Sequence, residues 1–230
     1  MKNAFLKLPF VFSENLLLED LKLCTAHKFN LHYNTSDYSG EWKSIALRSL
    51  NGDPNQIYAH ASGPENYQNT SLLASCNYFT KIIDSFKCEK ESIRLLNLSP
   101  NSKIKEHTDH NLGYGDGTFR IHIPVMTNAD VHFYIDTKEV SMQVGECWYG
   151  NFNLPHKVEN NGSKDRIHLI MDCTRNAWSD KLFSKAGYDF EFERRPAEYD
   201  ETTTLRMIEE LEQMNTEASK KLIQQLKSRS

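Results

Sequence analysis

The chain of 230 residues has no apolar stretch near the roughly 20 residues that a helix needs to span a bilayer. Its five cysteines are an odd number, lie far apart and include no C-x-x-C pair. This argues against a disulfide framework or a zinc ribbon and favours a reducing, cytoplasmic location. There is also no basic block, since the net charge is −4 and both signs are spread along the chain. We therefore expect neither nucleic acid nor membrane as a partner.

The N-terminal half combines helices, loops and few strands. Residues 4–12 alternate as a strand does, and Ser13 is a candidate N-cap for a helix that reaches about His27. Residues 30–69 are rich in Asn, Ser, Tyr and Gly, which is typical of loops with short strands. Between residues 71 and 86 the apolar side chains follow the spacing of one amphipathic helix.

From residue 93 the pattern changes to short β-like runs separated by turn residues. These runs are Ile93–Leu98, Thr118–Val125, Val131–Ile135, Val140–Val144, Cys147–Gly150, His156–Glu159 and Arg166–Cys173. Evenly spaced short strands of this kind predict an antiparallel barrel or sandwich. After Pro196 helical spacing returns, and the sequence leaves open whether this C-terminal helix packs on the barrel or on a second subunit.

His107 and Asp109 lie two residues apart, just after a predicted strand and its Pro-containing turn. In an extended segment, residues i and i+2 point to the same side, so an imidazole and a carboxylate face one metal ion. His156 follows Pro155 and opens a predicted strand, which makes it the best candidate for a second imidazole. Two histidines and one carboxylate leave three octahedral positions open, which lets non-haem iron(II) bind a bidentate co-substrate and dioxygen together.

Arg166 comes ten residues after His156 and begins the next predicted strand. A dicarboxylate that chelates iron through its 2-oxo acid end needs a cation for its distant carboxylate. A guanidinium fork suits that role better than a lysine. The H-x-D motif of His107 and Asp109 is weak alone, but together with His156 and Arg166 it predicts a site for Fe(II) and 2-oxoglutarate. Of the other histidines, we expect His168 to pack or to support the site and His110 to face solvent.

The segments around these residues resemble the aspartyl/asparaginyl β-hydroxylase family of 2-oxoglutarate oxygenases. They are IRLLNLSPNSKIKEHTDH, FRIHIPV, VGECWYGN and LPHKVENNGSKDRIHLIMD, between Ile93 and Asp172. The resemblance covers roughly a third of the chain. It implies a mostly β fold with flanking helices around a double-stranded β-helix, the jelly-roll of the cupin group. It also implies a dioxygenase that couples decarboxylation of 2-oxoglutarate to hydroxylation of an unactivated C–H bond.

Carried over residue by residue, the resemblance makes His107 and His156 iron ligands and Arg166 the partner of the distal carboxylate. It places Arg120 and His122 near the iron-proximal carboxylate of the co-substrate, and their i, i+2 spacing on a strand agrees. Animal members that modify protein side chains lack a carboxylate at the position of Asp109, whereas bacterial members that act on small substrates have one. The presence of Asp109 therefore weakens the inference that this chain shares the protein substrates of the animal members.

We expect a hydroxylase of an amino acid or amino-acid-derived metabolite that uses Fe(II), 2-oxoglutarate and O2 and releases succinate and CO2. The alternative within catalysis is β-hydroxylation of an Asp or Asn side chain in a peptide or protein. The non-enzymatic alternative is a cupin-like metal or ligand sensor, although a sensor has no need to hold both iron and 2-oxoglutarate. Halogenation is disfavoured because Asp109 fills the position that a halide requires.

The pattern of elements also predicts how the chain is divided. We assign residues 1–199 to a single oxygenase domain, with a helical and loop part at 1–92 and the β-helix core at 93–175. Residues 200–230 form a helical extension, through which an oligomer is possible.

Overall fold

A computed structural model describes residues 2–58, 63–194, 201–214 and 216–227. The chain separates into two compact units, Met1–Phe190 and Glu191–Ser230. The domain division expected at residues 199 and 200, and an oligomer formed through the extension, stay predictions. Among the described residues, no helix is both long and apolar enough to cross a membrane.

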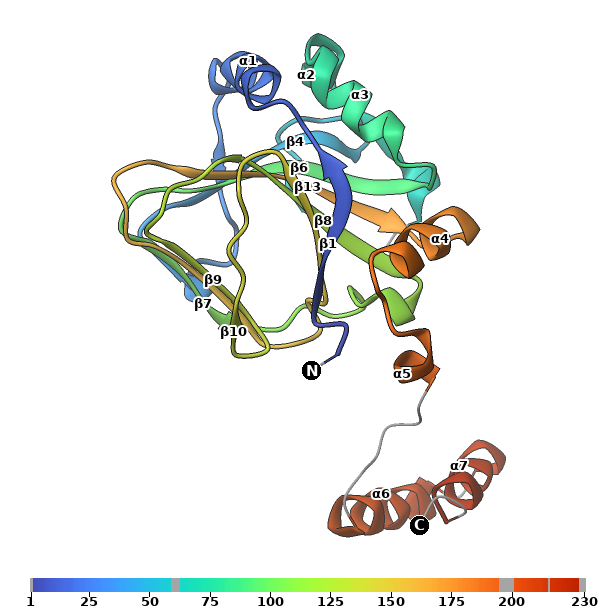
Figure 1. The fold of residues 1–230 in the computed structure, drawn as a ribbon. Helices are drawn as coiled ribbons and strands as arrows, with labels where there is room; N and C mark the ends of the chain where they lie inside the picture. Colours follow the sequence, from blue (N-terminus) through green and yellow to red (C-terminus); the bar gives the residue numbers. More distant parts are fainter. Residues whose placement is uncertain (1, 59–62, 195–200, 215, 228–230) are drawn as a thin grey trace. The chain divides into compact units, whose positions relative to one another are not determined.

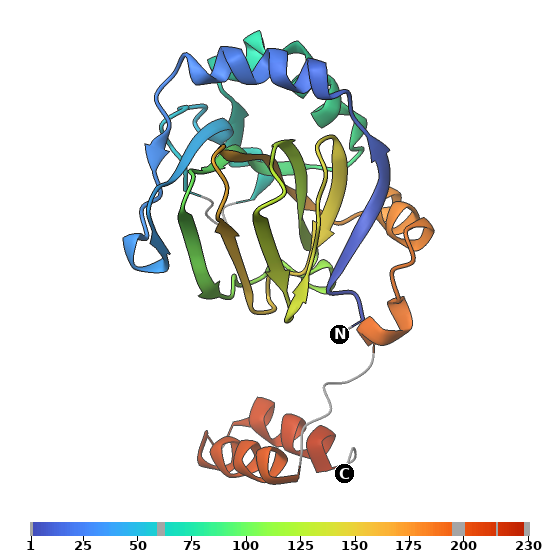
Figure 2. The same ribbon diagram turned by 60° about the vertical axis from the view of Figure 1, so that its left-hand side comes forward.

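The first unit is built on two antiparallel sheets that face each other (Figures 1 and 2). The strands of the larger sheet are β1 (Phe5–Val11), β2 (Asn30–Leu31), β4 (Trp42–Leu50), β5 (Tyr67–Asn69), β6 (Lys90–Leu98), β8 (Thr118–Met126), β11 (Glu146–Gly150) and β13 (Arg166–Thr174). The strands of the smaller sheet are β3 (Tyr38–Ser39), β7 (Ser102–His107), β9 (Val131–Ile135), β10 (Lys138–Glu139) and β12 (His156–Asn160). The orders are β1-β11-β8-β13-β6-β4-β2, with β5 beside β4, and β10-β9-β12-β7-β3. The predicted mostly β, jelly-roll fold with flanking helices is confirmed.

The period of two along the central strands divides the apolar side chains between two cores. Leu95 of β6 and Leu169 of β13 point to the outer face of the larger sheet and pack with the helices. Their neighbours Leu96 and Ile170 point between the sheets and pack with the strands of the smaller sheet. Both faces of the larger sheet are therefore covered, and the inner face forms one wall of the space between the sheets.

Three helices, α1 (Glu14–Thr25), α2 (Ser71–Ser75) and α3 (Asn77–Ser85), lie over the outer face of the larger sheet (Figures 1 and 2). After β13 come α4 (Ala177–Lys185) and α5 (Phe190–Arg194). The second unit holds α6 (Glu201–Met214) and α7 (Glu217–Lys227), where a C-terminal helix was expected.

The single amphipathic helix predicted between residues 71 and 86 is wrong, because the chain leaves the helical conformation at Cys76, with φ −98° and ψ 83°. The break is stabilised by Asp20 of α1. Its carboxylate accepts hydrogen bonds of 2.7 Å from the backbone N–H groups of Tyr78 and Phe79, in the first turn of α3. Ser13 stands at the start of α1, but its side chain makes no capping bond.

The strand predicted at Val140–Val144 is also wrong. Asp136 and Thr137 both have positive φ and turn the chain tightly, so β10 pairs with β9 immediately after the turn. The next apolar residues, Val140 and Met142, are buried in the inner core from a loop. Conversely, the structure contains one strand that was not predicted from the sequence: β7, whose last residue is His107.

Replacing Asp20 with Ala is expected to lower the free energy of unfolding by about 2–3 kcal/mol, because the backbone N–H groups of Tyr78, part-buried, and Phe79, buried, lose their carboxylate acceptor. Asp20→Asn retains an acceptor oxygen and is expected to lose less. Glu19→Ala, an exposed change on the same helix, serves as the control and is expected to stay within about 0.5 kcal/mol of the wild type. Urea unfolding measures all three, and an unchanged Asp20→Ala variant contradicts the stabilising role of this contact.

Candidate metal centre

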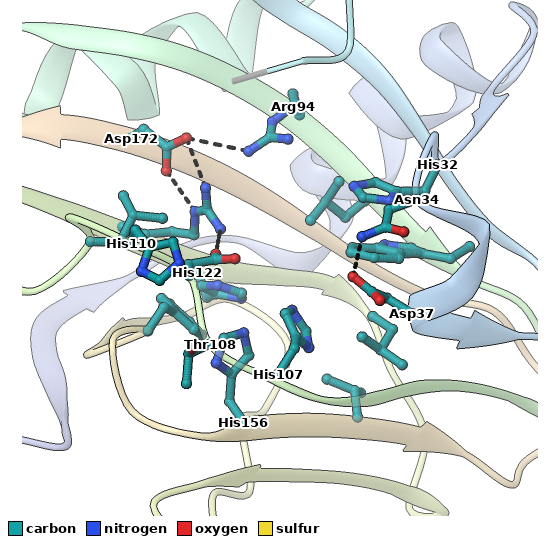
Figure 3. A pocket seen from close by; sticks show the side chains of 18 of the residues that line it. His32, Asn34, Asp37, Arg94, His107, Thr108, His110, His122, His156 and Asp172 are labelled. Carbon is teal, nitrogen blue, oxygen red and sulfur yellow. Dashed lines mark hydrogen bonds and ion pairs between the residues drawn. The ribbon is translucent and has the colours of Figure 1, made fainter. Parts of the chain in front are cut away.

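The register between β7 and β12 brings two histidines together. His156 is the cross-strand partner of His107, and their ring centroids lie 4.2 Å apart. Asp109 follows β7, and its backbone N–H donates to the carbonyl of Phe152 at 2.9 Å. One ligand atom from each of His107, Asp109 and His156 lies within 4.8 Å of the others. Figure 3 shows the two imidazoles side by side at the base of the pocket.

Backbone carbonyls determine which ring nitrogen each histidine offers. His107 Nδ1 lies 2.8 Å from the carbonyl oxygen of Lys105, and His156 Nδ1 lies 3.0 Å from that of Leu154. Since a carbonyl only accepts, both Nδ1 atoms carry the proton and both Nε2 atoms have a free lone pair. Burial and the neighbouring His107 lower the pKa of His156 to about 4, so this imidazole is neutral at pH 7, as metal binding requires.

The carboxylate of Asp109 belongs to a chain of alternating charges. Arg120 Nη1 donates to Asp109 Oδ2 at 2.7 Å, while Arg120 Nε and Nη2 donate to the two oxygens of Asp172 at 2.6 and 3.1 Å. Arg94 Nη2 approaches Asp172 from the other side, at 3.3 Å. Burial is the largest single effect and raises the pKa of Asp109, but Arg120, His156, His107 and Arg94 together outweigh it, and the net pKa lies below its usual value. Asp109 is therefore ionised, and Arg120 holds it through Oδ2 alone.

These side chains line one cavity of about 520 Å³, and Arg166 lies on its wall. Arg166 is 2% exposed and, among the described residues, has no carboxylate partner. Its Nη2 donates to His168 Nδ1 at 3.0 Å, and its buried Nε has no hydrogen-bond partner there. Burial lowers the pKa of Arg166 to about 9, which still leaves the guanidinium charged at pH 7.

The two other residues predicted for the co-substrate, Arg120 and His122, both line this cavity. All three guanidinium nitrogens of Arg120 are already bonded to carboxylates. His122 is buried, its Nδ1 lies 3.3 Å from His168 Nδ1, and its Nε2 has no hydrogen-bond partner among the described residues. His168 is buried against Arg166 and His122, whereas His110 is exposed at the edge of the cavity.

Sequence reasoning did not single out Arg94, Asp172 and Glu91, which also line the cavity. The sequence does contain a signal for Arg94 and Asp172. Each is a charge inside a strand that is otherwise almost entirely apolar, IRLLNL in β6 and RIHLIMDC in β13. A charge in such a strand is buried and needs a partner. Glu91 had no comparable signal, because it lies at the polar start of β6.

Comparisons with known proteins identify relatives of this chain. L-proline cis-4-hydroxylase of Rhizobium meliloti (strain 1021) is 27% identical over 175 residues, which cover 74% of this chain. The matched part spans 61% of the length of that relative. A solved oxidoreductase of the 2OG-Fe(II) oxygenase family from Burkholderia pseudomallei has the same fold, with a TM-score of 0.50 and 11% identity over 75% of this chain and 86% of that chain.

The model of one protein family, aspartyl/asparaginyl β-hydroxylase, matches residues 15–176. This segment runs from α1 to the end of β13 and includes both histidines, both aspartates of the charge chain and Arg166. The resemblance found in the sequence is thereby confirmed: the chain belongs to the aspartyl/asparaginyl β-hydroxylase family.

Proposed function

We propose that the protein is an Fe(II)- and 2-oxoglutarate-dependent dioxygenase that hydroxylates an unactivated C–H bond of a free amino acid or of an amino-acid-derived metabolite. The proposal depends mainly on one observation. Arg166 is a buried guanidinium without an acidic partner in the part of the chain that the structure describes, and it lies on the wall of the cavity that contains the His107, Asp109 and His156 cluster.

A buried charge without a counter-ion costs free energy, so proteins rarely keep one that no ligand pairs. The carboxylate of a ligand in the cavity would pair with Arg166 and accept a hydrogen bond from its free Nε. The His107, Asp109 and His156 cluster lies in the same cavity as Arg166. One molecule with a metal-chelating end and a distant carboxylate would therefore bind both a metal ion on this cluster and the guanidinium of Arg166. 2-Oxoglutarate has this shape, and the donor set of two imidazoles and one carboxylate suits iron(II).

Each residue then has a distinct task. His107 and His156 would hold the metal through Nε2, and Asp109 through the oxygen that Arg120 does not occupy. Arg120 orients Asp109, and His122 lines the cavity with an Nε2 that has no hydrogen-bond partner among the described residues. When bound, iron(II), 2-oxoglutarate and O2 would supply the oxidising chemistry, with O2 as the oxidant, and loss of CO2 and formation of succinate would be coupled to hydroxylation.

The relative named L-proline cis-4-hydroxylase supports a free amino acid as the substrate rather than an Asp or Asn side chain of a protein. The cavity volume of about 520 Å³ is in the range of small-molecule sites and leaves room for a substrate beside the co-substrate.

We expect His107→Ala and His156→Ala each to weaken Mn²⁺ binding by at least about 100-fold, since each removes one of three ligands, and loss of a supporting contact alone costs 10–100-fold. His110→Ala is the matched control, because His110 lies at the edge of the same cavity outside the cluster. Calorimetric titration with Mn²⁺ measures the affinities. Full binding by both His107→Ala and His156→Ala would place the metal elsewhere.

Arg166→Gln is expected to raise the dissociation constant for 2-oxoglutarate about 30-fold or more and to leave Mn²⁺ affinity unchanged. The reason is that loss of one partner of a buried charge pair costs about 2–5 kcal/mol. Arg48→Gln is the control, because Arg48 is a partly buried arginine of β4 outside the cavity. Titration of the manganese-loaded proteins gives the constants. An unchanged value for Arg166→Gln would assign the distal carboxylate to another cation.

A further inference from the structure

Cys24 and Cys76 are far apart in the sequence, but the fold brings their sulfur atoms together. Cys24 lies in the last turn of α1, and Cys76 occupies the break between α2 and α3. The two Sγ atoms lie 3.6 Å apart, and both side chains are fully buried. Sequence spacing does not show this pair, because the two cysteines are 52 positions apart and belong to different helical segments.

The pair lies away from the candidate metal centre. Both cysteines belong to the core in which the helices pack on the outer face of the larger sheet. Neither is among the described residues that line the cavity with the His107, Asp109 and His156 cluster. A site at Cys24 and Cys76 is therefore independent of the proposed function.

The two thiols share one hydrogen bond and differ in acidity. With Cys24 as the donor, this bond raises the pKa of Cys24 and lowers the pKa of Cys76. Burial and the carboxylate of Asp20 oppose the change in the pKa of Cys76 but do not reverse it. A thiolate, rather than a thiol, is the nucleophile in cysteine chemistry. Cys76 is therefore the sulfur that reacts first, and Cys24 is the partner that reacts second.

A disulfide between these residues requires only a small movement. The sulfur atoms of a disulfide lie about 2.05 Å apart, so the two Sγ atoms must approach each other by about 1.5 Å. Cys76 lies outside helical geometry, with φ −98° and ψ 83°, and the helix before it, α2, has only five residues. Such short helical segments shift and open at low cost. The break therefore lets Cys76 move toward Cys24 and admits a small oxidant to the buried pair.

We propose that Cys24 and Cys76 are a redox-modification site, at which hydrogen peroxide converts the two thiols into one intramolecular disulfide. The Cys76 thiolate attacks one peroxide oxygen and the O–O bond breaks, which gives a sulfenic acid and hydroxide. The sulfur of Cys24 then attacks the sulfenic sulfur, so that the S–S bond forms and the S–O bond breaks. The protons of the two thiols convert both departing hydroxides to water. Two thiols are thus oxidised by two electrons, and one peroxide is reduced to two water molecules.

The disulfide fastens the end of α1 to the junction of α2 and α3, which Asp20 of α1 already contacts by hydrogen bonds. A cross-link between positions 52 apart restricts the unfolded chain and is expected to raise the Tm by roughly 8–16 °C. The helices are then held more firmly under oxidising conditions, and a thiol reductant reverses the change.

Peptide mapping of the full-length chain, treated with hydrogen peroxide without added metal, tests the proposal. The remaining thiols are blocked in denaturant before digestion. We expect a linked peptide that contains Cys24 and Cys76, together with the rise in Tm, and loss of both on treatment with dithiothreitol. In Cys24→Ala, Cys76 should be recovered as a sulfenic acid that dimedone traps. In Cys76→Ala, Cys24 should react at least about tenfold more slowly than Cys76 does in Cys24→Ala.

Cys147→Ala is the matched control, because Cys147 is also fully buried but belongs to β11. This variant should retain both the linked peptide and the rise in Tm. Absence of a Cys24–Cys76 peptide from the oxidised wild type, or a disulfide between Cys88 and Cys173 in its place, would overturn the proposal. A rise in Tm that persists in both Cys24→Ala and Cys76→Ala would overturn the stabilising role of the disulfide.

Discussion

The candidate site depends on the register between β7 and β12, which makes His156 the cross-strand partner of His107. A slip of one residue would turn one imidazole to the other face of the sheet and separate the two rings. The register is supported on both sides. Towards β7 the register shifts by one residue between His156 and Val158, and beyond this shift Val158 pairs with Ile104. Towards β9 the pairing is continuous from His156 with Ile135 to Val158 with Phe133, and the side chains of Val158, Ile104 and Phe133 are buried in the inner core. Packing between the sheets therefore determines the geometry available to a metal ion.

Charge pairing is the second constraint on the space between the sheets. Buried guanidinium and carboxylate groups are tolerated when each has a partner, and Asp172, Arg120 and Asp109 meet this condition. Arg120 links Asp172 to Asp109 because its planar fork reaches two carboxylates at once. Arg166 does not meet the condition, and Arg94 meets it only in part. The places where internal pairing is incomplete are the places where ligand charges are expected.

Much of this could be predicted from sequence, for reasons of periodicity and spacing. The central strands are continuous apolar runs, and the H-x-D motif with its distant His and Arg gathers residues that have one joint chemical explanation. The break at Cys76 could not be predicted, because its stabilising partner Asp20 comes from a distant helix. The bulge at Glu91 depends on pairing with β13, which sequence periodicity does not report. The missing parts are those decided by tertiary contacts.

The central claim is that one cavity holds iron(II) and 2-oxoglutarate between the His107, Asp109 and His156 cluster and Arg166. A crystal structure of the protein with Mn²⁺ and 2-oxoglutarate tests it most directly. The account predicts one metal ion bound by Nε2 of both histidines and by Asp109, with the distal carboxylate of 2-oxoglutarate on Arg166. A metal ion bound by other residues, or a distal carboxylate on a different cation, would contradict it.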